Sequence, residues 1–452
     1  MKPQRPILVI GGGIAGLTAA YYVSRAGHKV VLLERAPILG GRIRSVRPTP
    51  ESAPIDWGQH LIIGAYQETL RLASLLGSRN RIHTITGPTP FLEESNTVHR
   101  YRISPLPAPF HALPGMIALG QLSLRERLML AKAAFGAKYE LQKHPSVLDT
   151  MTAREWLVTH SQGERAIDRF WEPLIVSTLN TPSTEASAYL FAVVLARGIF
   201  SSPEQARGML PETTLASVLV EPAVEAINAS GGTILTGRRA CRLLIDHSHI
   251  RGAVDDTGTL HEADVIILAV PPWNIPHFAR DIPELSPLVA SVSHFTPSPI
   301  ISVDLWFDRH WLPYHMASPL GGRFHWFFSH PSREPLGFRV SLVLSAADAM
   351  MKEPPEHIIS FANEDIRRFF PEAPAVATHH FIIRDPRATF RAKPGLEQVR
   401  PLPNTPISGL FLAGDWTATS LPATIEGAVL SGRRAAEAAC AWLLKTNQSE
   451  EW

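Results

Sequence analysis

The stretch Pro6-Ile-Leu-Val-Ile-Gly-Gly-Gly-Ile-Ala-Gly16 decides the fold of this chain. Its first five residues are apolar without interruption, which is typical of a strand buried on both faces of a parallel sheet. Glycines at 11, 13 and 16 follow with GxGxxG spacing, and residues 17–26 predict an amphipathic helix that Gly27 ends. Strand, glycine-rich turn and helix in this order predict a dinucleotide-binding α/β domain.

Each part of this turn has a physical role in holding a dinucleotide. Gly11 allows the tight turn, Gly13 lets the backbone approach a pyrophosphate, and Gly16 lets helix and strand pack closely. At the N-terminus of the helix that follows, unpaired N–H groups and the positive end of the helix dipole favour phosphate. We therefore expect the pyrophosphate at this helix N-terminus.

A second strand, at residues 29–33, ends at Glu34. This acidic residue follows Gly16 by 18 positions, where a carboxylate can accept hydrogen bonds from a ribose diol. GxGxxG alone is a weak signal, but together with both strands, the helix and the acid it predicts FAD or NAD.

Two further segments resemble the FAD motifs of the amine oxidase and carotenoid desaturase superfamily. Residues 34–42 resemble the extended FAD fingerprint, in which a GG-R segment closes over the pyrophosphate and the arginine, here Arg42, approaches the cofactor. Residues 409–416 resemble the second FAD motif, in which a strand delivers an aspartate, here Asp415, to the ribityl chain. Both ends of the chain therefore indicate FAD.

The resemblance extends to a final helix and to a strand meander. Residues 422–432 begin the helix, whose N-terminus would point at the N1/O2 edge of the flavin, where reduced flavin is negative. Residues 232–245 predict a strand pair that 250–254 continue as a meander, and the backbone near Ala240 would meet the adenine. The residues assigned to FAD are Gly11, Gly13, Ile14, Ala15, Gly16, Glu34, Arg35, Gly41, Arg42, Gly58, Gln59, His60, Ala240, Gly414, Asp415, Thr424, Ile425, Glu426 and Ala428.

Composition excludes several classes of protein. The 452 residues contain 43 Lys and Arg against 41 Asp and Glu, a net charge of +2 that is too balanced for nucleic-acid binding. Two cysteines, Cys241 and Cys440, exclude a disulfide framework, and neither lies in the second FAD motif, so FAD is expected to be non-covalent. The 19 histidines are scattered, so no metal site is expected. Without a targeting or membrane-spanning segment, a cytoplasmic location is predicted.

The segment pattern predicts two interleaved domains. An FAD-binding Rossmann-type α/β domain would take residues 1–90, 212–285 and 400–445. A substrate domain of mixed helices and antiparallel sheet, an α+β unit, would take 91–211 and 286–399. Its first block is mainly helical, and its second holds strand-like runs at 300–307, 324–328 and 338–344.

Three blocks resemble a narrower group, the bacterial squalene-associated FAD proteins that act as hydroxysqualene dehydroxylases in hopanoid pathways. They are residues 56–66 with Gln59-His60, residues 170–187, and residues 414–432. The resemblance runs from about residue 6 to 442. The first two blocks discriminate, whereas the FAD motifs are common to the superfamily. Ser420 stands where the group usually has glycine, which puts only local loop shape in doubt.

This resemblance implies conversion of hydroxysqualene to squalene in squalene and hopanoid biosynthesis. The hydroxyl would leave as water, and hydride from reduced flavin N5 would quench a delocalised C30 carbocation. An acid near the hydroxyl would accelerate its departure by about 10²–10⁴-fold. His60 is the candidate acid, although it could instead only order the flavin; Glu426 could also serve, but capping of its own helix is preferred.

A carbocation needs a dry site and aromatic faces rather than a base. Candidates for those faces are Trp306, Phe307, Trp326, Phe327 and Phe328, although aromatic residues in such strands are more often part of the core. No second GxGxxG with a following helix is present, so the reductant is expected to be an external electron donor. Alternative functions are a carotenoid or polyprenoid desaturase or isomerase, an amine oxidase, and a non-enzymatic prenyl-binding carrier of the GDP-dissociation-inhibitor type.

A C30 hydrocarbon partitions into lipid, so the protein is expected to bind a membrane surface peripherally. The best candidate segment is 107–143. Residues 108–119 are apolar and predict a loop, and residues 122–143 predict a helix with Leu124, Leu128, Ala131 and Phe135 on one face. That face could instead pack on the core. On the helix the basic residues Arg125, Arg127, Lys132, Lys138 and Lys143 outnumber Glu126 and Glu140, which suits anionic lipid.

Overall fold

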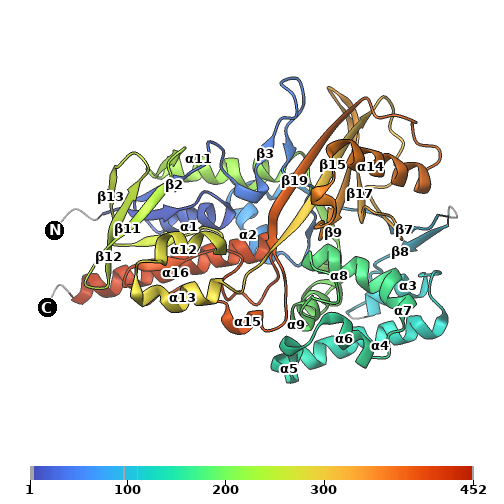
Figure 1. The fold of residues 1–452 in the computed structure, drawn as a ribbon, viewed down its shortest axis with the longest axis horizontal. Coiled ribbons are helices and arrows are strands. Elements are labelled where there is room, and N and C mark those ends of the chain that lie inside the picture. Colours follow the sequence, from blue (N-terminus) through green and yellow to red (C-terminus); the bar gives the residue numbers. More distant parts are fainter. Residues whose placement is uncertain (1–4, 95–96, 109, 450–452) are drawn as a thin grey trace.

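Five parallel strands form the sheet that carries the glycine-rich turn, at the left of Figure 1. The computed structural model describes residues 5–94, 97–108 and 110–449. The sheet order is β10-β2-β1-β14-β20, so neighbours come from stretches far apart in the chain. This parallel sheet confirms the predicted Rossmann-type fold class. Its strands are β1 (Ile7–Ile10), β2 (Val30–Glu34), β10 (Thr233–Thr236), β14 (Ile266–Leu268) and β20 (Leu410–Leu412).

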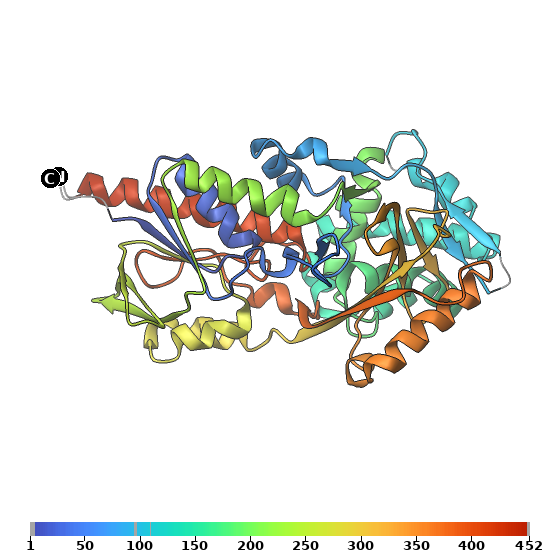
Figure 2. The same ribbon diagram turned by 90° about the horizontal axis from the view of Figure 1, so that it is seen from above.

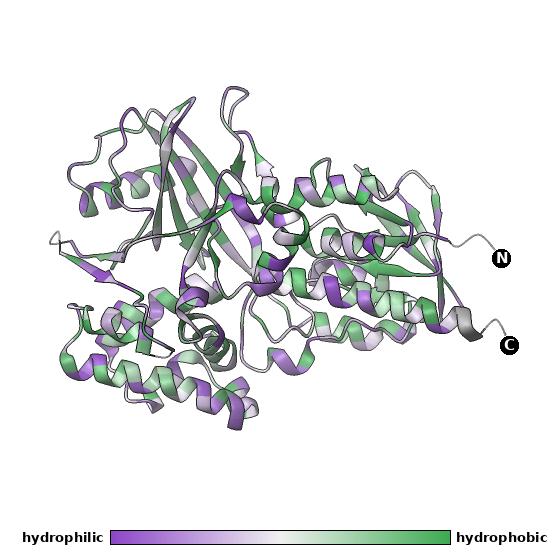
Figure 3. Cartoon of the chain, turned by 180° about the vertical axis from the view of Figure 1, so that it is seen from behind, coloured by the Kyte–Doolittle hydropathy of each residue, from purple (hydrophilic) through white to green (hydrophobic). Residues whose placement is uncertain are grey.

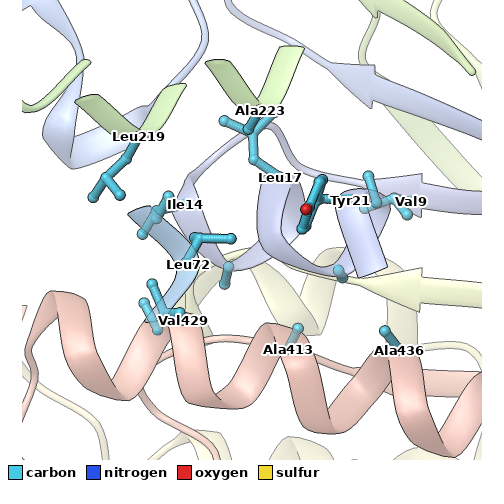
Figure 4. Packing of buried hydrophobic residues seen from close by; sticks show 14 of the residues in the cluster. Val9, Ile14, Leu17, Tyr21, Leu72, Leu219, Ala223, Ala413, Val429 and Ala436 are labelled. Atoms are coloured by element: carbon cyan, nitrogen blue, oxygen red, sulfur yellow. The ribbon is translucent and has the colours of Figure 1, made fainter. Parts of the chain in front are cut away.

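One face of this sheet is covered by helices from both ends of the chain. The helices α1 (Ile14–Arg25) and α16 (Ile425–Ser449) lie against each other, joined by α2 (Gln67–Leu75) and α11 (Glu221–Ala229). Figure 4 shows Leu17, Leu72 and Val429 from three of them in one buried cluster. A Cβ at Gly432 would lie 2.2 Å from the Ala15 carbonyl oxygen, so only glycine permits this approach of α16 to α1.

The opposite face of the sheet packs on a meander and two short helices. Alternation along β1 sends Ile7 and Val9 to the first face and Leu8 and Ile10 to this one. The expected strand pair at 232–245 is wrong in its first strand. Residues 233–236 join the parallel sheet as β10. They pair with β2 and not with the meander. The elements are β11 (Ala240–Asp246), β12 (His249–Asp255), β13 (Leu260–Glu262), α12 (Ile275–Ala279) and α13 (Ser286–Val292).

A seven-stranded sheet forms the other end of the elongated molecule (Figures 1 and 2). Its order is β19-β15-β18-β17-β16-β7-β8, antiparallel except where β16 meets β7. The helix α14 (Pro355–Phe369) covers one face of it through Ile358, Ala362 and Ile366. Its strands are β7 (Thr89–Leu92), β8 (Val98–Tyr101), β15 (Pro297–Phe307), β16 (Met316–Pro319), β17 (Trp326–Glu334), β18 (Gly337–Ser345) and β19 (His379–Phe390).

A block of helices lies below this sheet in Figure 1, around its own core with Trp156, Trp171 and Phe191. β9 (Gly208–Pro211) leaves the block and pairs with β5 (Ile62–Ile63) and β6 (Ile82–Thr84), linking the block to the N-terminal segment. The domain boundaries given above stay a prediction. The helices are α3 (Leu113–Ile117), α4 (Leu124–Lys143), α5 (Pro145–Thr150), α6 (Ala153–Thr159), α7 (Glu164–Ala166), α8 (Glu172–Leu179), α9 (Ala188–Val194) and α10 (Pro203–Ala206).

The predicted helix at 122–143 is present as α4, and its expected apolar face points to solvent. Leu124, Leu128 and Phe135 are 68%, 60% and 44% exposed, whereas the opposite face with Leu130 and Ala133 is buried. Packing on the core therefore uses Leu130 and three alanines, on the face opposite to the one with Leu124, Leu128 and Phe135. Figure 3 shows hydrophobic and hydrophilic segments alternating along α4, at its lower left.

The apolar stretch before α4 is wound into helix rather than loop. A 3₁₀ turn at Phe110–Ala112 leads into α3, and Met116 is buried while Ile117 is 62% exposed. Pro109 in this predicted loop lies outside the described residues. Among the helices of the described chain, none combines the length and the apolar character that a membrane crossing requires.

Candidate functional site

A cavity of about 1430 Å³ runs from the carboxyl ends of the parallel strands into the space between the helical block and the seven-stranded sheet. All of the residues assigned to FAD from the sequence line it except Gly16. A Cβ at Gly16 would lie 1.9 Å from the Gly11 carbonyl oxygen, so this glycine allows α1 to pack on the turn. The motifs predicted to bind FAD are far apart in the sequence, and in the folded chain they surround one cavity.

The turn at the head of α1 has the shape and chemistry that a pyrophosphate requires. A Cβ at Gly13 would meet no atom within 4 Å, so the backbone faces open space there. Gly13 is also the N-cap of α1 and supplies no side-chain cap to the N–H groups of the first turn. Ile14 and Ala15 in that turn line the cavity. Uncapped donors beside open space fit the phosphates of FAD.

Glu34 is held at the end of β2 by two backbone donors. Its carboxylate accepts hydrogen bonds from the Gly12 N–H at 2.6 Å and the Ala36 N–H at 2.8 Å. Each oxygen keeps further lone pairs toward the cavity, which Glu34 lines together with Arg35. The carboxylate is therefore fixed in place and able to accept a ribose hydroxyl.

Arg42 and Asp415 join the two FAD motifs directly. The two terminal nitrogens of Arg42, Nη1 and Nη2, donate to the Asp415 carboxylate at 2.8 Å, and Nη1 also donates to the Ala388 carbonyl at 3.0 Å. Burial lowers the pKa of Arg42, but the charge of Asp415, its hydrogen bonds and the charge of Asp385 together outweigh this, and the net pKa is raised. Arg42 therefore keeps its charge, and its hydrogen bonds to Asp415 fix the loop after β20 against residue 42.

His60 is a neutral ring in this site. Burial is the main cause that lowers its pKa to about 4, so it is uncharged at neutral pH. Its Nε2 lies 3.3 Å from the Arg42 carbonyl oxygen, which can only accept, so Nε2 carries the proton and Nδ1 has a lone pair. This environment favours the ordering role over the acid role, which stays a prediction.

Glu426 does not cap its own helix as expected. Its carboxylate accepts from the backbone N–H groups of Glu68 and Thr69 and from the Thr69 hydroxyl, all within 2.9 Å. These donors belong to the first turn of α2, so Glu426 caps a neighbouring helix that starts nearby. Thr424 instead caps α16 through the Gly427 N–H at 3.2 Å.

Asp56 anchors the segment that leads to Gln59 and His60. Its carboxylate accepts from the Leu215 N–H at 2.9 Å. Burial raises the pKa of Asp56 to about 7, although this backbone donor and the Arg339 charge lower it in part. The group therefore titrates near neutral pH without lining the cavity.

The part of the cavity away from the glycine turn is largely apolar. Only two of the five predicted aromatic residues, Trp326 and Phe328, line it. Phe307 and Phe327 face the core under α14 because neighbouring strand residues point to opposite faces, and Trp306 packs beside Ile55. Other lining residues of this part are Phe91, Tyr101, Ile103, Phe170, Leu174, Val193, Ile199, Ile300, Met316 and Val343.

Sequence reasoning missed two arginines that contribute to the site, one in the cavity wall and one buried beneath the second FAD motif. Arg400 is buried and donates to the carbonyls of Asp415, Thr417 and Leu421, so it holds the loop of the second FAD motif. Arg44 lies 3.8 Å over the Trp57 ring at the cavity wall. No spacing rule flags a lone arginine, and only the proximity of Arg44 and Trp57 to the recognised motifs could have signalled them.

Comparisons with known proteins agree with this geometry. The profile of the flavin-containing amine oxidoreductases matches residues 14–440. Hydroxysqualene dehydroxylase of Sinorhizobium fredii is 31% identical over 95% of this chain and 97% of its own length. The 15-cis-phytoene desaturase of Synechococcus elongatus is 26% identical over 96% and 95%. An oxidoreductase structure from Methanosarcina mazei covers 96% of this chain and 100% of its own, with a TM-score of 0.72 at 19% identity, which shows likeness of fold.

Proposed function

The chain belongs to the flavin-containing amine oxidoreductase family, and from this premise we propose that it reduces hydroxysqualene to squalene. It is an FAD-dependent oxidoreductase. In the proposed reaction the C–O bond of the substrate breaks, the hydroxyl leaves with a proton as water, and a C–H bond forms from a hydride. Reduced FAD, when bound, supplies that hydride.

The residues of this chain would bind, orient and keep the reacting atoms dry. The uncapped turn at Gly13 and the carboxylate of Glu34 would hold the two ends of the adenosine diphosphate. The Arg42–Asp415 pair would fix the ribityl side, and the N-terminus of α16 would favour negative charge on the flavin edge. The apolar walls around Trp326 and Phe328 would exclude water from a cationic intermediate.

The observation that carries the proposal is the apolar cavity continuous with the FAD turn. Its apolar walls suit a long hydrocarbon. A charged amine would need polar partners there, so the cavity disfavours amine oxidation. The 31% identity to a hydroxysqualene dehydroxylase, over 95% of this chain, supports hydroxysqualene as the substrate. Phytoene desaturases match at 26%, and they favour a polyprenoid desaturase as the second candidate.

We further propose that the substrate is collected from a membrane surface. In the described chain, seven of the fourteen exposed large hydrophobic side chains lie between residues 106 and 139. We call Phe110, Ile117, Leu124, Leu128 and Phe135 the apolar surface. Monomeric soluble proteins rarely expose a large group of apolar side chains unless that surface binds a membrane, a ligand or another protein.

Basic side chains border the apolar surface and match anionic lipid. Arg125, Lys132 and Lys138 are exposed on α4, whereas the two acidic side chains of this helix are engaged. Glu126 caps α4 at Ser123, and Glu140 binds His160. The helix therefore presents apolar and positive groups together, as a helix lying on an anionic bilayer does.

Anaerobic single turnover tests the proposed reaction. Photoreduced holoprotein is mixed with hydroxysqualene, and squalene is measured by mass spectrometry while flavin reoxidation is followed by absorbance. We expect one squalene per flavin oxidised, and no product from oxidised protein. Oxidised protein that dehydrogenates phytoene, with no squalene formed from hydroxysqualene, would establish the desaturase instead.

An external electron donor is part of the proposal. The protein alone, kept anaerobic with NADPH, is then expected to retain its oxidised flavin spectrum for many minutes. Rapid stoichiometric bleaching by NADPH would show that the protein takes electrons from nicotinamide directly.

A further inference from the structure

The strand β8 and the residues that follow it separate two cavities. Tyr101 and Ile103 line the large cavity described above. Arg100 and Arg102 line a second cavity, of about 460 Å³, because alternate residues of an extended chain point to opposite sides. Met316 of β16 lines both. The second cavity therefore lies one residue layer away from the first.

The second cavity has the chemistry of an anion site. Arg100, Arg102 and His315 supply positive charge or N–H donors, and no carboxylate is among its lining residues in the described chain. Neither arginine side chain makes a hydrogen bond or an ion pair with another described residue. Two free guanidinium groups on one side of a strand suit the oxygens of a phosphate group. The other lining residues are Ile85, Thr86, Pro88, Pro313 and Tyr314.

The extended segment that bounds this cavity also contacts the part of the chain that carries the apolar surface. The helix α3 packs directly on β8, since a Cβ at Gly115 would lie 2.7 Å from both the Tyr101 ring and the Arg102 carbonyl oxygen. Ile117, at the end of α3, belongs to the apolar surface, and its carbonyl accepts from Arg127 of α4. The basic groups that could reach headgroups and the helix that carries Ile117 thus border the same extended segment, from different sides.

We propose that the second cavity binds the phosphate group of an anionic phospholipid. The proposal rests on the membrane docking put forward above and adds a defined headgroup site to it. A phosphate held by Arg100 and Arg102 would fix β8 at the level of the headgroups. The large cavity, walled by Tyr101 and Ile103 on the other side of the same strand, would then begin next to the bilayer from which an isoprenoid arrives.

Binding of FAD-loaded full-length protein to vesicles provides the first test. The pocket variant is Arg100→Gln with Arg102→Gln. Its matched control is Arg25→Gln with Lys29→Gln, which removes the same charge from exposed positions on and just after α1, at the other end of the molecule (Figure 1). On phosphatidylcholine containing phosphatidylglycerol we expect the pocket variant to raise Kd by about 10-fold or more, and the control by less than about twofold.

Titration with soluble ligands separates this site from docking itself. Monomeric dihexanoyl phosphatidylglycerol needs no bilayer, and we expect calorimetry to detect its binding to wild type and to the control variant but not to the pocket variant. Inorganic phosphate or pyrophosphate that binds as tightly as this lipid would assign the cavity to a free anion and overturn the lipid assignment. Equal weakening of vesicle binding by both charge-removing variants, or no binding of the soluble lipid, would also overturn it.

Discussion

Arg42 and Asp415, 373 positions apart in the chain, form a two-point ion pair with both N–O distances at 2.8 Å. Asp415 is almost fully buried, whereas the Arg42 side chain is 38% exposed. The pair is thus a clamp between the first and second FAD motifs, and its energetic value is reduced by the exposure of the arginine.

Replacing Asp415 by Asn is expected to weaken both the fold and FAD binding, because Arg42 loses the counter-charge that ties it to the loop after β20. We expect about 1–3 kcal/mol less stability by chemical denaturation of apoprotein, and a higher Kd for FAD. The control is Asp264→Asn, which removes an exposed partner of Arg5 and should change stability by less than about 1 kcal/mol. Equal losses of stability in the two variants would show that the Arg42–Asp415 pair stabilises the protein no more than an exposed ion pair does.

Two glycines of the same turn should fail in different ways when they are changed to alanine. Gly13→Ala places its Cβ in open space, so the protein should fold with nearly unchanged Tm and yet lose FAD, whose phosphates need that space. Gly16→Ala places its Cβ 1.9 Å from the Gly11 carbonyl oxygen and should lower the Tm of the apoprotein itself. FAD released by acid and apoprotein melting curves separate the outcomes. A Gly13→Ala protein with full FAD content would place the pyrophosphate elsewhere.

His60→Gln tests whether the neutral imidazole donates a proton. With a pKa of about 4 the ring is uncharged through the neutral range, so we expect less than a 10-fold loss in single-turnover rate at pH 7. The flavin absorbance envelope should shift, since the ring contacts the Arg42 carbonyl. A loss of 100-fold or more, with a rate that falls as pH rises through the neutral range in wild type only, would restore the acid role.

Asp56 should make stability depend on pH. Its pKa of about 7 in the folded protein lies above its ordinary value of 3.8, so folding takes up a proton between these pH values. Its contribution is therefore complete below about pH 4 and is lost as pH rises through 7, by at most about 1.4 kcal/mol per pH unit. Asp56→Asn should gain stability relative to wild type as pH rises from 5 to 8, measured by urea unfolding. A constant difference would exclude this titration.

The apolar surface gives a prediction about vesicle flotation. Ile117→Ser with Leu128→Ser should reduce flotation with anionic vesicles strongly, because both side chains are at least 60% exposed and their replacement removes little packing within the protein. Met116, in the same segment, is buried and would test folding instead. The matched control is Val376→Ser with Leu402→Ser, which removes apolar groups that are at least as exposed and lie outside the apolar surface. Equal flotation of the two variants would remove the assignment to this surface.

Local sequence patterns predicted the FAD-binding fold. They did not predict contacts between residues that are far apart in the sequence. The order of strand, glycines, helix and acid is a short-range signal, and the five-stranded sheet follows from it. The partner of residues 233–236 is β2, some 200 residues earlier, and no local feature distinguishes this pairing from a hairpin. Glu426 likewise caps a helix whose start is not near it in the sequence.

Helix periodicity located α4 and the face with Leu124, Leu128 and Phe135, but it left open whether that face is exposed or packs on the core. Both of its faces contain apolar residues, and large ones conventionally mark the core. Here Ala133, Ala134 and Ala137 face the core because neighbouring helices approach closely, and the larger residues are left outside. Alternation in strands similarly required knowledge of register: Trp326 and Phe328 line the cavity while Phe327 does not.

The parallel sheet, closed by β20 at one edge and by α16 over α1, has a consequence for synthesis on the ribosome. β1 and β2 emerge first, but their neighbour β14 and the helix that covers α1 are encoded hundreds of codons later. At ordinary elongation rates of 5–20 residues per second, this interval is roughly 20–80 s. Throughout it the nascent strands expose apolar faces, so yield in a heterologous host should depend on chaperone supply and codon tempo more than on the equilibrium stability of the finished protein.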